Sequence, residues 1–264
     1  SIAQAYVAND PLAWWRLDEA AGELEAVDKV GLQHGSYNVV GDSHFDGDDF
    51  VDVGALDLEQ PEFTIAAKIE PTSFTVSDAR IIAKENGLDE ENHFWSLTTT
   101  IKSDESRLRF RLTTNDGTHE AIADERLEAG KSYCVQATYD GRKMRLYQNG
   151  KRVAEAKHSG HPKTNAHCHV WIGDTPAGAG KRPFDGKIQD VAIFNKAITM
   201  DEAKAITATC SACSSQPSEE VANDIEPADP VPEVLPPADV PEPPQIVAPP
   251  TPNPPVNVRP LLQF

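Results

Sequence analysis

The sequence has few basic residues, few cysteines and no long hydrophobic run. Its 24 Lys and Arg residues stand against 42 Asp and Glu residues, a net charge of −18 that repels phosphate backbones and excludes nucleic acid as the expected partner. Without about 18 consecutive apolar residues, no segment is expected to span a membrane. The opening SIAQAYVANDPLAWW has neither a basic nor an apolar leader pattern, so a signal peptide is expected to be absent or already removed.

The four cysteines are an even, small number, which favours two disulfides and an oxidising, extracellular location. Four cysteines allow three pairings, and we expect Cys134 to pair with Cys168 and Cys210 with Cys213. The alternative is four free thiols in a cytosolic or virion protein. The Cys-x-x-Cys spacing at 210–213 lacks the preceding strand–helix–strand unit of a redox site, so the preferred interpretation is a local structural disulfide or a crosslink to a neighbouring chain.

Composition changes sharply after Cys213. Residues 214–264 hold 15 of the 21 prolines, and eight acidic residues against a single basic one. Such a segment cannot bury a core of its own and favours polyproline II. We therefore predict a folded domain over residues 1–209, followed over 210–264 by a Cys-x-x-Cys hinge and an acidic extended tail. Apolar residues near its end would anchor the tail on a protein partner or another copy of the chain: Leu261, Leu262 and Phe264.

Short β-type runs between turn signals fill the first region. In RLRFRLTT, Leu108, Phe110 and Leu112 face one way and the arginines between them the other, as in a half-buried antiparallel strand. Only one clear helix is expected, after an N-cap at Thr199. These patterns predict an all-β, antiparallel two-sheet jelly roll with one short C-terminal helix. The turn signals between strands are Asp116-Gly117, Asp140-Gly141 and Asn149-Gly150.

Five blocks, in order along the chain, carry a family resemblance. They are LAWWRLDEAAG (12–22), FDGDDFVDVG (45–54), FTIAAKIEP (63–71), VQATYDGRKMRLYQNGKRV (135–153) and FDGKIQDVAIFNKAITMDEAKAI (184–206). Together they resemble the laminin G-like, concanavalin A-like jelly roll domains over about residues 6–207, with Lys68 where that family usually has Trp. The resemblance implies the sandwich fold but no single function, because this fold hosts glycan binders, hydrolases, adhesion modules and structural domains.

Glycosidases of this fold resemble one another in a strand of alternating acids, Glu-x-Asp-x-(x)-Glu, which places the nucleophile and the acid/base on one face. The nearest approach here is Asp57-Leu58-Glu59, in an apparent loop. We therefore predict a protein that is not an enzyme, with an unrecognised polysaccharide hydrolase as the least favoured interpretation.

The stretch HFDGDDFVDVG contains four aspartates around Gly47. One interpretation is turn chemistry, with Phe50, Val51 and Val53 supplying core side chains. The other is calcium, which laminin G-like domains often bind at the sandwich rim through scattered Asp side chains and carbonyls. By that resemblance Asp46 or Asp48 would be a ligand, and no motif fixes the remaining candidates: Asp18, Asp185 and Asp190.

A histidine-rich stretch, HSGHPKTNAHCHVW, suggests a transition-metal site as an alternative. If residues 167–172 form a strand, its first and third residues share one face. The other interpretation is an exposed hairpin that happens to be rich in histidine. The four candidate ligands are His158, His161, His167 and His169.

Glycan-binding domains of this kind use exposed aromatic rings that stack on sugars. Trp14 and Trp15 are adjacent, so in a strand they point to opposite faces and at least one could be exposed. Trp171, at a strand end, is the third stacking candidate. Core placement is the alternative for each, because large aromatics are mostly buried.

The preferred functional hypothesis is a non-enzymatic extracellular module. Its jelly roll would assemble into, or decorate, a filament, virion or surface layer through the Pro-rich tail. The alternative is a calcium-dependent carbohydrate-binding or adhesion lectin that uses the tail as a stalk.

Overall fold

The computed structural model describes residues 2–20, 22–38, 43–58, 60–89, 92–176 and 178–213, the side chains of 2, 3 and 211–213 excepted. All of these residues belong to one folded unit, 1–219. The second unit, 220–264, lies outside the described residues, and so do the predicted tail anchors Leu261, Leu262 and Phe264.

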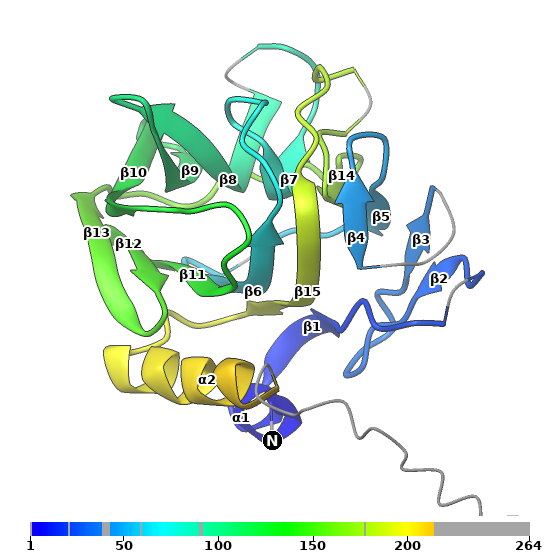
Figure 1. Cartoon of the computed structure of the whole chain (residues 1–264). Coiled ribbons are helices and arrows are strands. Elements are labelled where there is room, and N and C mark those ends of the chain that lie inside the picture. Colours follow the sequence, from blue (N-terminus) through cyan, green and yellow to red (C-terminus); the bar gives the residue numbers. More distant parts are fainter. Residues whose placement is uncertain are drawn as a thin grey trace, which may run out of the picture. The chain divides into compact units, whose positions relative to one another are not determined.

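Two antiparallel sheets face each other in the folded unit, as the alternating patterns predict (Figure 1). The 7-stranded sheet runs in the order β1 (Pro11–Trp15), β15 (Asp185–Phe194), β6 (Glu62–Pro71), β11 (Tyr133–Asp140), β12 (Lys143–Gln148) and β13 (Lys151–Lys157), with β4 (His44–Asp46) also paired to β15. The 8-stranded sheet runs β10 (Gly117–Arg126), β9 (Glu105–Thr114), β8 (His93–Lys102), β7 (Arg80–Glu85), β14 (His169–Ile172), β5 (Val51–Ala55), β3 (Gly35–Tyr37) and β2 (Glu25–Ala26).

The main core lies between the sheets and follows the period-two alternation of the strands. On β9, Leu108, Phe110 and Leu112 are fully buried in it, whereas the arginines between them are only partly buried, so the predicted facing is confirmed. The Asn149-Gly150 hairpin is confirmed as well. It joins β12 to β13 with φ angles of 51° and 75°, the left-handed values that a two-residue hairpin turn needs.

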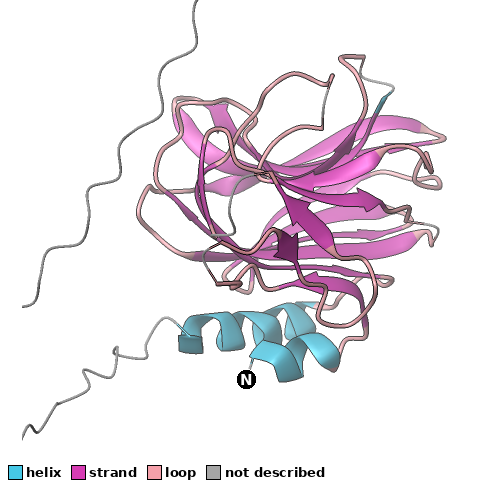
Figure 2. Cartoon of the chain, turned by 90° about the vertical axis from the view of Figure 1, so that its right-hand side faces the viewer, coloured by secondary structure: helices cyan, strands magenta, loops and turns pink. Residues whose placement is uncertain are grey.

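Two helices pack on the outer face of the 7-stranded sheet (Figure 2): α1 (Ile2–Val7) and α2 (Met200–Cys213). The N-cap at Thr199 is confirmed as a capping box, since the Glu202 amide donates to Thr199 Oγ1 at 3.3 Å and the Thr199 amide donates to Glu202 Oε2 at 2.7 Å. The sequence did not predict α1, which is six residues long. Residues 210–213 form the end of α2 rather than a hinge. Within the described residues, no helix is long and apolar enough to cross a membrane.

Candidate functional site

Trp171 lies on the outer side of the 8-stranded sheet. Its neighbours on β14, Val170 and Ile172, are fully buried in the core, so alternation turns the Trp171 side chain outward. The ring is half-buried there, with Asp52 of β5 as its cross-strand partner. Of the three tryptophans predicted to stack on glycans, this is the one that the structure leaves at the surface.

Phe50 stacks on Trp171 face to face, with ring centroids 3.7 Å apart and planes within 3°. Asn38 holds the Phe50 backbone through two hydrogen bonds. Its side-chain Oδ1 accepts from the Phe50 backbone N–H at 2.6 Å, and its backbone N–H donates to the Phe50 carbonyl at 3.1 Å. The prediction of Phe50 as a core residue is therefore wrong, whereas Val51 and Val53 are core residues as predicted.

A cavity of about 490 Å³ opens beside the ring pair. Asp174 shapes its wall, since the buried Oδ1 accepts from the amides of Thr175 and Arg182 at 2.7 Å each. An exposed ion pair between Lys181 and Asp48 also lines the cavity, and Lys181 lowers the pKa of the Asp48 carboxyl. The lining residues are Asp48, Phe50, Leu88, Trp171, Asp174, Thr175, Pro176, Gly178, Gly180 and Lys181.

A smaller cavity of about 220 Å³ shares Trp171 and Pro176 with the larger one. Phe50 does not line it, so the indole contributes surface there that its stacking partner leaves open. His169 Nδ1 lies 2.9 Å from the Asp52 carboxylate, which places a hydrogen-bonded polar pair next to the ring. Together, an aromatic surface and convergent polar groups beside it are features of small-ligand sites.

The other two predicted stacking tryptophans are buried. Trp15 points into the main core, where its Nε1 donates to the Gln33 carbonyl at 2.7 Å. Trp14 points to the opposite face, as predicted, but is only 4 % exposed because α1 and α2 cover that face. Tyr6 of α1 lies 5.3 Å from the Trp14 ring. The prediction that one of the two could be exposed is wrong, because the sequence did not reveal α1.

The five calcium candidates lie at separate places. Asp46 and Asp185 face each other across β4 and β15, whereas Asp48 pairs with Lys181. Asp18 and Asp190 share Arg16, at 3.0 and 3.8 Å. Within residues 2–213, apart from the few gaps, no group of three or more His, Cys, Asp or Glu side chains comes together for a metal ion. Calcium binding therefore stays a prediction.

The four candidate histidines do not form one cluster. His158 is buried, stacks on His119 at 4.3 Å and lies 3.2 Å from Thr114 Oγ1. His167 and His169 line the small cavity beside Trp171 instead. Strand β14 begins only at His169, so His167 sits in a turn and the expected shared face is absent. Among the described residues the four do not gather as a ligand group, so a transition-metal site, like calcium binding, stays a prediction.

The expected Cys134–Cys168 disulfide is absent, and both cysteines are buried free thiols. They cannot pair, because Cys168 belongs to the main core while Cys134 faces the helices on the other side of the 7-stranded sheet. Cys210 is a free buried thiol too, and the side chain of Cys213 lies outside the described residues. Burial raises the pKa of Cys168 to about 11, which keeps it protonated.

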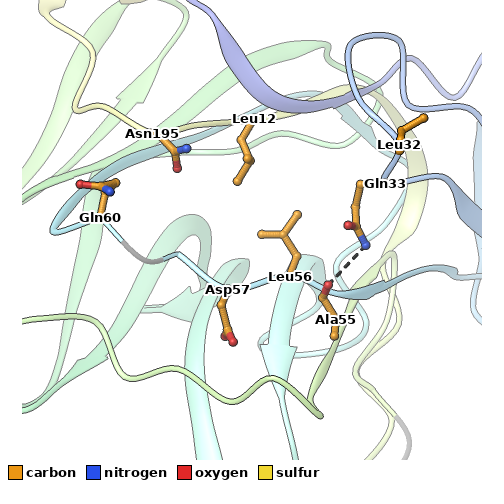
Figure 3. A pocket seen from close by; sticks show the side chains of 8 residues that line it. All are labelled: Leu12, Leu32, Gln33, Ala55, Leu56, Asp57, Gln60 and Asn195. Carbon is orange, nitrogen blue, oxygen red and sulfur yellow. Dashed lines mark hydrogen bonds between the residues drawn. The ribbon is translucent and has the colours of Figure 1, made fainter.

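A third cavity, of about 460 Å³, lies near the start of β1 and the end of β15 (Figure 3). Leu12 and Leu56 point toward each other across it, and Asn195 points inward. Two of its polar groups are engaged: Gln33 Nε2 donates to the Val53 carbonyl, and Asp57 binds the buried Lys84 Nζ at 2.8 Å. No aromatic ring lines it, which makes it a poorer place for a sugar.

Two antiparallel sheets packed face to face as a jelly roll are the architecture of the concanavalin A-like sandwich domains. The chain belongs to the concanavalin A-like lectin/glucanase superfamily, whose laminin G model (Laminin_G_3) matches residues 45–204. No curated protein matches it.

Solved structures resemble the chain in fold. A heptameric SAP-like pentraxin from Limulus polyphemus is 18 % identical, with a TM-score of 0.50 over 62 % of this chain and 80 % of that one. Domain 4 of the Geobacillus stearothermophilus arabinanase AbnA, solved with arabinotriose, is 13 % identical, with a TM-score of 0.50 over 73 % and 84 %. A Trypanosoma rangeli sialidase mutant is 12 % identical, with a TM-score of 0.56 over 77 % of this chain but 33 % of that one. At these identities the likeness establishes the fold alone.

Proposed function

We propose that the domain is a carbohydrate-binding module, and that its glycan binds against the Trp171–Phe50 ring pair. The observation that carries the proposal is this pair, which lies half-buried on the outer side of the 8-stranded sheet between two cavities. A sugar ring has an apolar C–H face that packs on an aromatic ring, and hydroxyl groups that need hydrogen-bond partners at its edge.

The polar groups around the rings fit a neutral glycan. The Asp52 carboxylate and the His169 imidazole lie on one side of Trp171, and Asp48 with Lys181 lies on the other. They offer both acceptors and donors to sugar hydroxyls. Asp174 also lines the larger cavity, whereas the Glu85 carboxylate is buried and paired with Arg80 at 2.9 Å, so the carboxylates of Asp48, Asp52 and Asp174 outnumber the single Lys181 cation. An anionic sugar would meet repulsion there.

The relatives support the same class of function. The superfamily is one of lectins and glucanases, and the arabinanase domain was solved with arabinotriose bound. The sialidase among the structural neighbours keeps hydrolysis as the competing hypothesis. A release assay for reducing sugar, on every polysaccharide that the protein binds, separates the two: steady release identifies a hydrolase, and binding without release supports the module.

The direct test is retention of the full chain on a panel of immobilised neutral poly- and oligosaccharides. Trp171→Ala should lose retention, because it removes the stacking surface. Leu32→Ala is the matched control, since Leu32 is 92 % exposed and lines the cavity without aromatic residues. If the wild type binds nothing on the panel, or Trp171→Ala binds as well as the wild type, the proposal fails.

Two sequence-based predictions can be tested in the same assay. Calcium dependence predicts that EDTA abolishes retention and that added calcium restores it; unchanged retention in EDTA contradicts it. Assembly through residues 214–264 stays a prediction, because those residues lie outside the described part of the chain. A chain ending at Cys213 should bind glycans normally but lose self-association, as measured by sedimentation velocity.

A further inference from the structure

Cys134 is positioned on the outer face of the 7-stranded sheet, beneath helix α2. On β11 its neighbour Val135 points into the main core, so Cys134 points the opposite way, into the helix-facing cluster. Asn149 fixes the Cys134 backbone through two hydrogen bonds. Its side-chain Oδ1 accepts from the Cys134 backbone N–H at 2.9 Å, and its backbone N–H donates to the Cys134 carbonyl at 2.8 Å. The thiol is therefore presented to α2 from a rigid strand.

Cys210 lies in the last turns of α2, on the face that is buried against the sheet. Ala203, Ile206 and Cys210 are spaced three and four residues apart and are at most 1 % exposed, which defines that face. One turn earlier, Gln136 Nε2 of β11 lies 3.5 Å from Thr207 Oγ1. Gln136 and Cys134 share a face of β11, so the two elements run alongside each other at Cys210.

The Cys134 and Cys210 side chains are buried together in this helix-facing cluster, at 5 % and 1 % exposure. Tyr6 of α1 belongs to the same cluster and donates its hydroxyl to the Asp190 carbonyl at 3.0 Å. Contact between the thiols and their burial raise the pKa of Cys210, so within the packed cluster the thiol stays protonated. Two buried thiols in one apolar cluster are unreactive while the cluster is packed, but they lie on two elements that face each other, β11 and α2.

We propose that Cys134 and Cys210 form a disulfide that fastens the C-terminal helix to strand β11. The oxidant is a small-molecule disulfide such as oxidised glutathione. One cysteine thiolate attacks a glutathione sulfur and releases one glutathione thiol, giving a mixed disulfide on the protein. The second cysteine thiolate then attacks the protein sulfur of that bond and releases the second glutathione thiol. Two protein thiols are oxidised and one glutathione disulfide is reduced to two thiols.

The bond would secure the end of α2 that adjoins the proline-rich sequence beginning after Cys213. The other end of the helix already has its capping box at Thr199 and Glu202. With the bond in place, a pull on residues 214–264 would be transmitted to β11 through a covalent link near the helix end. Because the packed thiols are protonated, the exchange should proceed during folding, or when the last turn of α2 opens.

Peptide mapping of the full chain tests this proposal. The protein is denatured in guanidinium with reductant and refolded in reduced and oxidised glutathione. Free thiols are then alkylated, and the digest is analysed by mass spectrometry. We expect a linked peptide pair containing Cys134 and Cys210, with Cys168 and Cys213 alkylated, so that two of the four thiols are lost. A dominant Cys134–Cys168 or Cys210–Cys213 bond, or four alkylated cysteines, would overturn it.

A second measurement does not depend on a variant that could misfold. Hydrogen exchange of the oxidised and reduced wild type should differ at residues 207–210, with slower exchange when oxidised, and should agree at β9 in the opposite sheet. Equal exchange at 207–210 in both redox states contradicts a fastened helix.

Cys168→Ser is the matched control for the peptide mapping. It removes a buried thiol from the main core and should leave the Cys134–Cys210 peptide pair unchanged.

Discussion

The outer faces of the two sheets differ in what covers them. On the 7-stranded sheet, α1 and α2 cover Trp14 and Cys134, and Tyr6 and Cys210 on the helices are buried in the same cluster. On the 8-stranded sheet, Trp171 and Phe50 stay half-buried at the surface, beside two cavities. The same residue type thus serves structure on one face and is available for binding on the other. Which role a tryptophan takes depends on whether a neighbouring element covers it.

The largest effect is expected from removing Trp15, a tryptophan of the main core, which gives the scale against which the two outer faces are compared. Trp15→Ala leaves a cavity at a fully buried position of the main core. It also removes the hydrogen bond from Trp15 Nε1, so the Gln33 carbonyl loses this donor. We expect a loss of about 3–5 kcal/mol in the free energy of unfolding. Guanidinium denaturation followed by circular dichroism measures it. A loss below about 1 kcal/mol would mean that Trp15 is not a packed core residue.

The covered face should also respond to pH through Asp190. Burial raises the pKa of its carboxyl to about 6, although Arg16 partly offsets this. Ionisation therefore opposes folding: the stability that the protonated carboxyl supplies is fully present below pH about 4 and is lost as the pH rises through about 6.

Asp190→Asn removes that dependence while keeping a side chain that tolerates the φ of 50° found there. At pH 8 the variant should be more stable than the wild type by on the order of 2 kcal/mol, and at pH 4 the two should be nearly equal. Thermal unfolding from pH 4 to pH 8 measures the difference. Parallel profiles for the two proteins would contradict a raised pKa.

A smaller effect concerns how the covering helix is held. Thr199→Ala removes the side-chain oxygen that accepts from the Glu202 amide. The expected loss is about 1 kcal/mol of stability. Thr199→Ser, which keeps the hydroxyl, is the matched control and should stay close to the wild type. Equal losses in the two variants would show that the cap is not the cause.

On the open face we expect a stability effect as small as that of the helix cap. Trp171→Ala removes a half-buried ring and its stack with Phe50, for a loss of about 1 kcal/mol in the free energy of unfolding. The comparison with Trp15→Ala under the same denaturant conditions separates a tryptophan of the main core from one on the open face. A loss as large as that of Trp15→Ala would place Trp171 among the structural residues.

The strands and turns could be predicted because their signals are local. Alternation on β9, the Asn149-Gly150 dipeptide and the Thr199 cap each specify structure within a few residues. The site could be predicted only in part. Trp171 was a candidate, but its stack with Phe50 and its neighbour Asp52 arise from pairing between strands more than a hundred residues apart. Only that strand register could have revealed them.

The cysteine pairing failed for the same reason. Sequence spacing gives no information about which face of a sheet a thiol reaches, and the contact between Cys134 and Cys210 depends on α2 folding back over β11. Trp14 was misjudged because α1 is too short to leave a periodic signal. The strands of each sheet could therefore be predicted from the sequence, whereas the packing of α1 and α2 on one outer face could not.

Hydrogen exchange of the protein with and without its best-binding neutral glycan tests the central claim most directly. The open face should bind and the covered face should not. We therefore expect ligand-induced protection at residues 50–55 and 169–172, with no change in α1, α2 or β11. Protection centred on the helices, or none at residues 169–172 under saturating glycan, would contradict the account.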